Sequence, residues 1–391
     1  MLQTLIALSQ VSQCLHATVQ PHIYKSISIG NLHRFVRTLV VRPDLGTLVH
    51  RAEIEWDHWG QPTVDPEEVD SIQRAGEEMG VDPLAIAGSC HAYFALMLHL
   101  VPNLRVLCVR IPESPYVWHG PGDLTKWVGQ RIPAGLRSLR EISLFWDGFR
   151  MDDIMPFVRL PNLSTISLCG FIVEDWHWRR NHRKQFSFKN LTLRVYGHPE
   201  RDVYGDARGV VDVVGMARSL EEFVWEDEEM EEGALRMLGW HSKTLKKLLI
   251  SVPWQTRLSS TSWEPLPLSD FTSLRSLGIP CSFLQDSQGG QVDLFSVLPG
   301  SLEALRLDMD DWSGDESVRV LMNHNLEKWK EQRSLCLPLL EDMVCVFDWV
   351  DAGSAGKLEA MGFRVELRPM RTSTAPRERH PMIPSFIGLP S

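Results

Sequence analysis

Apolar residues recur along most of this chain in one short pattern, which can be written L-x-x-L-x-L with any apolar residue at the three fixed positions. Nine segments match the pattern, and their starts lie 24 to 38 residues apart. The matching segments are Leu104-Leu107-Val109, Leu139-Ile142-Leu144, Leu163-Ile166-Leu168, Phe188-Leu191-Leu193, Leu220-Phe223-Trp225, Leu245-Leu248-Ile250, Leu274-Leu277-Ile279, Leu302-Leu305-Leu307 and Leu340-Met343-Cys345.

The spacing inside each segment predicts a short strand with one apolar side. The second and third apolar positions lie two residues apart, so they point the same way from a strand, and the first lies where the chain turns in. One unit cannot bury this apolar edge alone. Neighbouring units must therefore stack into a parallel sheet in chain order, backed by helices, of which three are predicted at 210–218, 233–240 and 316–329. The uneven spacing predicts an irregular solenoid of the α/β class.

The residues before and after these segments show other patterns. A helical face of Leu8, Val11, Leu15 and Val19 is predicted to end at Pro21. Further elements are predicted as a strand at 26–29, a helix that begins after the N-cap candidate Asn31, a strand at 52–56, helices within 65–102, a last helix capped by Gly362, and a closing strand at 363–367. Residues 370–391 lack periodicity, which predicts a flexible tail.

Composition narrows the class of protein. The 391 residues carry 40 basic and 50 acidic side chains, and a net charge of −10 disfavours phosphate-rich partners, so we expect no nucleic-acid partner. The seven cysteines never form a C-x-x-C pair, which favours a reducing compartment, cytoplasmic or nuclear. No apolar run reaches the roughly 20 residues that cross a bilayer, so we expect no membrane partner.

Two charged segments leave open whether they bind something. Residues 174–184 gather two histidines with acidic and basic side chains, and residues 221–232 hold eight carboxylates. A metal or an anionic partner at the first segment, and a cation or basic peptide at the second, stand beside the simpler interpretation of solvated loops. Residues 351–358 lack the first glycine and the hydroxyl of a phosphate loop, and Ser89 lacks the surroundings of a nucleophile. We therefore expect no catalytic residue, no cofactor and no metal.

The opening stretch LQTLIALSQVSQCLHATVQPHIYKSISI resembles the C-terminal half of a fungal F-box. The residues that carry the resemblance are Leu5, Leu8, Val11, Ser12, Pro21, Ile23, Tyr24 and Ile27. The segments FVRTLVVRPDLGTLV, AEIEW and LPNL are similar to fungal F-box and leucine-rich-repeat proteins. The first F-box helix of the L-P-x-E type has no counterpart in this sequence, so the resemblance is to a truncated or degenerate F-box.

The resemblance implies a domain organisation and a function. Residues 1–29 would be the partial F-box, 30–103 a helical linker with a first repeat-like unit, 104–369 an irregular leucine-rich-repeat solenoid, and 370–391 the tail. The chain would be a substrate-recognition subunit of a cullin-RING ubiquitin ligase, or else an interaction scaffold without a ligase. The residues expected to bind the Skp-type adaptor are Leu5, Leu8, Val11, Pro21 and Tyr24. The residues expected to face an unknown protein target are Glu141, Thr165, Arg194, Glu222, Lys247 and Arg306.

Overall fold

Twelve parallel strands form the frame of the molecule in a computed structural model of the chain. The residues that the structure describes are 13–55, 66–80, 90–110, 133–149, 157–171, 186–194, 213–226, 237–251, 268–280, 294–308, 328, 332–347, 352–360 and 362–367. The strands are β1 (Ser26–Ile29), β2 (Arg51–Glu55), β3 (Val106–Arg110), β4 (Glu141–Phe149), β5 (Thr165–Phe171), β6 (Asn190–Arg194), β7 (Glu222–Glu226), β8 (Lys247–Ser251), β9 (Ser276–Pro280), β10 (Ala304–Asp308), β11 (Asp342–Phe347) and β12 (Arg364–Leu367).

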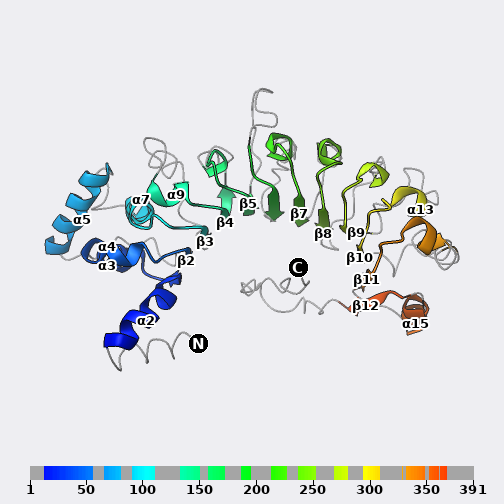
Figure 1. Ribbon diagram of the computed structural model, residues 1–391, viewed down its shortest axis with the longest axis horizontal. Coiled ribbons are helices and arrows are strands. Elements are labelled where there is room, and N and C mark those ends of the chain that lie inside the picture. The colour runs from blue at the N-terminus through cyan, green and yellow to red at the C-terminus, as the bar shows by residue number, and fades with distance from the viewer. Residues whose placement is uncertain are drawn as a thin grey trace.

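The strands lie side by side in the order in which they occur along the chain, and every pair is parallel. The sheet does not close on itself. It lines the inner side of an arc, and the helices lie on the outer side (Figure 1). The nine segments that match the apolar pattern all lie at β3 to β11, so the prediction of a parallel sheet in chain order is confirmed. The ladder also includes β1 and β2, upstream of those segments.

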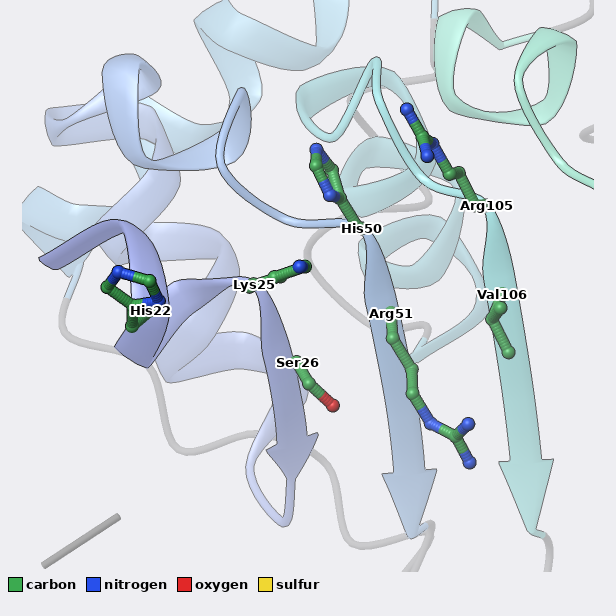
Figure 2. A pocket seen from close by; sticks show the side chains of 7 residues that line it. All are labelled: His22, Lys25, Ser26, His50, Arg51, Arg105 and Val106. Atoms are coloured by element: carbon green, nitrogen blue, oxygen red, sulfur yellow. The ribbon is translucent and has the colours of Figure 1, made fainter. Parts of the chain in front are cut away.

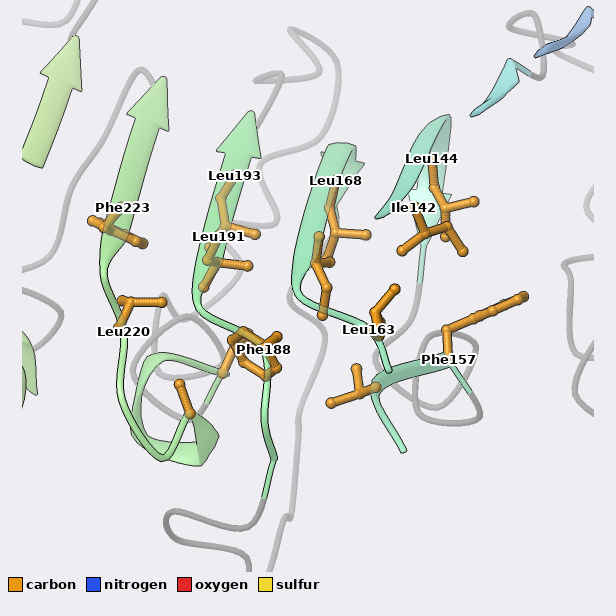
Figure 3. Packing of buried hydrophobic residues seen from close by; sticks show 14 of the residues in the cluster. Ile142, Leu144, Phe157, Leu163, Leu168, Phe188, Leu191, Leu193, Leu220 and Phe223 are labelled. Atoms are coloured by element: carbon orange, nitrogen blue, oxygen red, sulfur yellow. The ribbon is translucent and has the colours of Figure 1, made fainter. Parts of the chain in front are cut away.

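The register of the sheet explains the pattern. The second and third apolar positions of one unit pair with the same positions of the next, as Leu191 pairs with Phe223 and Leu193 with Trp225. Side chains at these positions are buried from β3 to β11, and Figure 3 shows several of them pointing to one side of the strands into the core. The burial alternates strictly in β6, β7 and β8, as a strand with one face on the core requires.

Among the described residues, the longest helices lie at the N-terminal end of the sheet (Figure 1). The helices are α2 (Gln13–Tyr24), α3 (Leu32–Val41), α4 (Pro43–Gly46), α5 (Pro66–Met79), α7 (Cys90–Leu100), α9 (Ala134–Arg137), α13 (Leu294–Val297) and α15 (Ala352–Ala360), with 3-10 turns η2 (Gly239–His241) and η3 (Leu268–Asp270). The core residues of α7 include Tyr93 and Phe94, each 1% exposed. Asn31 caps α3 as predicted, because its side chain accepts a hydrogen bond from the N–H of Arg34 over 3.0 Å.

Two helix predictions differ from the structure. Helix α2 continues past Pro21 to Tyr24, because the Pro21 carbonyl accepts the Lys25 N–H over 3.1 Å and Tyr24 packs against the core. Within the predicted helix 210–218 only 213–216 are helical among the described residues. Within the predicted helix 233–240 the described residues 237–240 are helical, the last two as part of η2. Most of the predicted helix 316–329 and the tail 370–391 lie outside the described residues.

The last unit ends as the sequence predicts. Gly362 adopts a φ of 88°, the left-handed conformation that favours glycine. Its N–H donates to the Glu359 carbonyl over 2.9 Å, and the N–H of Phe363 donates to the Leu358 carbonyl over 3.0 Å. These two bonds form a Schellman cap, and the buried side chains of Phe363 and Leu358 supply the apolar contact that accompanies it. The cap turns the chain from α15 directly into β12.

Small polar side chains join the turns of successive units. The side-chain amides of Asn103 and Asn162 donate to the carbonyls of Thr47 and Arg137, each over 2.7 Å. The hydroxyls of three further residues do the same for the preceding turn: Thr244 to Leu220, Ser273 to Lys243 and Ser301 to Leu274. Each bond satisfies a turn carbonyl that the sheet leaves unpaired, so the turns stack as regularly as the strands.

Candidate interaction surface

The inner face of the sheet carries three rows of side chains that alternate with the core positions. The first row comprises the residues just before the second apolar position of each unit, the middle row lies between the two core positions, and the last row follows them. Glu141, Thr165, Glu222 and Lys247 lie in the first row, Arg306 in the middle row and Arg194 in the last row. All six are partly exposed.

The register places four of these six residues in two neighbouring pairs. Glu141 lies beside Thr165 on the adjacent strand, and Glu222 lies beside Lys247. Adjacent parallel strands are about 4.8 Å apart, so each pair presents its polar atoms together. The structure thus sets out donor, acceptor and charged groups at close intervals across the middle of the arc.

The two arginines among these six residues form ion pairs. Arg194 binds Glu226 of the next strand through two contacts, Nε to Oε2 at 2.8 Å and Nη2 to Oε1 at 3.3 Å. Arg306 Nε lies 3.2 Å from Oδ1 of Asp308, whose side chain is 1% exposed. Such two-point and buried pairs hold a guanidinium in one orientation. Arg194 and Arg306 therefore present their remaining surface in a fixed geometry.

The middle row changes character along the arc. From β1 to β6 it consists of Ser28, Glu53, Cys108, Ser143, Ser167 and Thr192. From β7 to β9 it consists of two apolar residues, Val224 and Leu249, and of Gly278, which has no side chain. A Cβ on Gly278 would collide with the end of the Leu249 side chain, so a larger residue here requires that side chain to shift. Burial raises the pKa of the Cys108 thiol, which keeps it protonated at neutral pH.

Charged side chains gather on β2 and β3. Nη2 of Arg110 lies 2.9 Å from Oε1 of Glu53, and Nη1 lies 3.8 Å from Oε1 of Glu55. The same guanidinium lies over the ring of Phe145 on β4, 5.3 Å from its centre. This cation–π arrangement and the two acids hold Arg110 across three strands.

A further row runs along the edge of the sheet where the strands begin. This pre-strand row consists of the residue immediately before each strand from β1 to β11: Lys25, His50, Arg105, Arg140, Ser164, Lys189, Glu221, Lys246, Arg275, Glu303 and Glu341. The backbone of this row is hydrogen-bonded from one strand to the next. The carbonyl of Arg105, for example, accepts the N–H groups of Arg140 at 2.8 Å and Glu141 at 3.0 Å.

A pocket of about 630 Å³ opens at the N-terminal end of this row. It is lined by His22, Lys25, Ser26, His50, Arg51, Arg105 and Val106. Figure 2 shows Lys25 extending from the start of β1 toward His50, with Arg105 at the start of β3 and Arg51 running along β2. The lining holds three basic side chains and two histidines, and no acidic side chain.

Sequence reasoning did not single out the pre-strand row. These positions are the first x of the apolar pattern, where any residue fits, so the pattern itself says nothing about them. A signal was nevertheless present: the residue that follows the first apolar position is basic in Leu104-Arg105, Leu139-Arg140, Phe188-Lys189, Leu245-Lys246 and Leu274-Arg275.

The residues expected to bind an adaptor are only partly described. Leu5, Leu8 and Val11 lie outside the described residues. Pro21 is exposed in the last turn of α2, and Tyr24 is partly exposed and packs against the core. Tyr24 therefore serves the attachment of α2 to the sheet, whatever else it contacts.

Other candidate chemistry finds no centre in the described part of the chain. No group of three or more side chains suited to hold a metal ion occurs among the described residues. Residues 174–184 and the second half of the acidic segment 221–232 lie outside them. Residues 352–358 belong to α15, so the stretch compared with a phosphate loop is helical. Within the described ranges, no helix has the length and apolar character needed to span a membrane.

Comparison with known proteins adds no relative. No protein-family model matches the sequence, and no match was found among curated proteins.

Proposed function

We propose that this protein is a recognition subunit of the leucine-rich-repeat class that holds a protein target on the inner face of its sheet. The single observation that carries the proposal is the open, twelve-stranded parallel sheet with its inner face lined by partly exposed residues of mixed charge. An array of repeated strands of this kind offers an extended concave surface, which such proteins use for binding.

The size of the inner face suits a protein partner. Twelve strands spaced about 4.8 Å apart give a width of about 50 Å, and strands of five residues give a height of about 16 Å. Their product, about 800 Å², equals the area that each partner contributes to a standard protein–protein interface. A small molecule would occupy a minor part of this area. The face therefore fits a folded protein or a long segment of one.

The N-terminal segment supports a link to a ubiquitin ligase, and we extend the proposal to this role. The segment up to Ile29 resembles part of an F-box, and α2 lies at the end of the sheet against β1, away from the inner face (Figure 1). An adaptor bound to α2 would leave the inner face free for the target. Ubiquitin transfer would then follow from the raised effective concentration of target lysines, with no catalytic residue in this chain.

The target-binding part is tested with substitutions on the inner face. Ser143→Arg together with Thr192→Arg places two bulky charges in the middle row on β4 and β6. The matched control, Ser187→Arg with Thr272→Arg, adds the same charge at exposed positions outside the strands. Quantitative proximity labelling should recover a set of proteins that the inner-face variant loses about tenfold or more and the control retains. Equal recovery with both variants would remove the inner face as the binding surface.

The adaptor part is tested by co-purification with a Skp-type adaptor. The expected result is a stoichiometric complex that survives the Ser143→Arg and Thr192→Arg substitutions, because these lie away from α2. Retained target binding with no adaptor complex would eliminate the ligase role and leave an interaction scaffold.

A further inference from the structure

Four consecutive members of the pre-strand row are basic or histidine, at the starts of β1 to β4. They are Lys25, His50, Arg105 and Arg140, and the first three line the pocket together with Arg51 (Figure 2). Lys25, Arg51, Arg105 and Arg140 are exposed. Since neighbouring parallel strands are about 4.8 Å apart, the four members of the pre-strand row at β1 to β4 form a line about 15 Å long. Ser164 ends the line at β5.

The second half of the same row is neutralised by acids. Glu221 lies between two lysines, with Lys189 Nζ at 2.6 Å from Oε1 and Lys246 Nζ at 2.7 Å from Oε2. Further along, Arg275 Nη1 lies 3.4 Å from Glu303 Oε1. The two lysines hold the pKa of Glu221 below its ordinary range through these hydrogen bonds. Neighbouring residues of the pre-strand row can therefore form ion pairs with one another where the sequence places an acid beside a base.

The first half has no such compensation within the described residues. Lys25, Arg51, Arg105 and Arg140 form no ion pair with any described carboxylate, although Glu53 and Glu55 lie on β2 and are bound by Arg110 instead. Arg105 and Arg140 immediately precede neighbouring strands, which lie about 4.8 Å apart, and like charges at about that separation repel by somewhat less than about 1 kcal/mol even in bulk water. A chain with a net charge of −10 has more acids than bases, yet the acids of the pre-strand row, Glu221, Glu303 and Glu341, all lie in its second half.

We propose that this basic edge binds an acidic segment of a protein, through carboxylates or phosphate monoesters on successive side chains. The guanidinium groups of Arg51 and Arg105 suit such anions, because their paired N–H donors match both carboxylate and phosphate oxygens. The proposal rests on the proposed function in one respect, that the segment belongs to the target protein. A peptide tests the edge separately from the inner face.

Charge and length favour a protein segment over other polyanions. A nucleic acid or a membrane would extend beyond the line of four bases and meet Glu221, Glu303 and Glu341 of the same row, in a chain that is acidic as a whole. An acidic segment of a few residues fits within about 15 Å, since an extended peptide rises about 3.3 Å per residue. The pocket of about 630 Å³ also has room for a few side chains.

The test uses the full chain and fluorescence anisotropy of labelled ten-residue peptides. One peptide is rich in glutamate, a second carries phosphoserines in place of the glutamates, and a third is neutral. An oligonucleotide and vesicles with anionic lipid complete the set. The glutamate or the phosphoserine peptide should bind, the neutral peptide should not, and added salt should weaken binding because these charges are exposed. The stronger of the two acidic peptides identifies the source of the anion.

Paired variants locate the site. Lys25→Gln with Arg105→Gln should weaken acidic-peptide binding about tenfold, as the loss of two exposed charge contacts requires. The matched control, Lys246→Gln with Arg275→Gln, removes the same two residue types from the neutralised half of the row and should leave the affinity unchanged. Circular dichroism and thermal melting confirm that both variants fold.

The outcomes separate this proposal from the proposed function. Equal weakening by both variant pairs, no binding of either acidic peptide, or tight binding of only the oligonucleotide or the vesicles would overturn the basic edge as a peptide site. None of these results would contradict target binding by the inner face, which the Ser143→Arg and Thr192→Arg variant tests separately.

Discussion

The imidazole of His241 joins two units through the backbone of Leu220 and Val214. Its Nδ1 accepts a hydrogen bond from the Leu220 N–H over 3.3 Å, and its Nε2 lies 2.9 Å from the Val214 carbonyl oxygen. Only Nε2 can then carry the hydrogen, so the ring is neutral with one defined tautomer. His241 is 2% exposed. A histidine in this setting fixes the turn before β8 to the turn before β7.

Replacing His241 by leucine should destabilise the protein by roughly 1 to 3 kcal/mol, because it leaves the buried N–H of Leu220 without a partner. The Val214 carbonyl loses its bond to His241 but keeps the one from the Ala217 N–H. Urea denaturation followed by circular dichroism measures the change. The control is His22→Leu, at an exposed position of α2, which should change the unfolding free energy by less than about 0.5 kcal/mol. Similar losses for both variants would show that the buried hydrogen bonds contribute little.

The stability contributed by Glu221 should depend on pH. Its pKa in the folded protein is lowered from the ordinary 4.5, chiefly by hydrogen bonds from Lys189 and Lys246. A lowered folded-state pKa stabilises the fold above the unfolded value, and this stabilisation is lost as the pH falls through the folded value. Glu221→Gln should therefore melt at a lower temperature than the wild type at pH 7, and the difference should shrink below pH 4.5. A difference that stays constant down to pH 3 would contradict the ion-pair origin.

Two glycines of the last unit should respond in opposite directions to alanine. Gly362→Ala forces a side chain into the left-handed conformation, with Met343 Cε at 3.3 Å from the new Cβ, and should cost about 1 kcal/mol. Gly356→Ala lies inside α15 with nothing within 4 Å of the new Cβ, and should stabilise by about 0.5 to 1 kcal/mol. Thermal melts of both variants measure the two effects. A stabilising Gly362→Ala would disprove the Schellman cap.

Truncation of Trp225 to alanine should have a large but local effect. The side chain is 0% exposed in the core of β7, and its loss should cost about 3 to 5 kcal/mol. Because β7 pairs with β6 and β8, faster amide hydrogen exchange should appear in these strands and leave β2 and β11 protected. Exchange accelerated equally at both ends of the sheet would show that the arc unfolds as one cooperative unit.

The strands were predictable because their signal is local. In a segment such as Phe188-Leu191-Leu193, six residues suffice to predict which positions face the core. The structure pairs Leu191 with Phe223 and Leu193 with Trp225 of the next unit. The connecting helices were harder to predict. Among the described residues of the predicted helix 210–218, the helix ends at 216 because the chain pairs with Phe186 instead, where the Arg218 N–H donates to the Phe186 carbonyl over 2.9 Å.

The surface features were much less predictable. The six target-facing candidates follow directly from strand parity, and the structure places them on the rows of the inner face, where their role stays a prediction. Which of them are paired depends on residues distant in sequence, since Arg194 meets Glu226 across 32 positions. The basic edge depends on the same long-range register: Lys25, His50 and Arg105 are ordinary surface residues until three strands align them.

The uninterrupted chain-order pairing of the sheet has a mechanical consequence. Each strand is hydrogen-bonded to the strands before and after it in the sequence, so small rotations at successive junctions add up along the arc. The sheet should therefore be stiff at each junction between two strands and flexible over its whole length. The curvature of the sheet can then adjust to a slightly larger or smaller partner, because the deformation energy is divided among many strand-to-strand junctions.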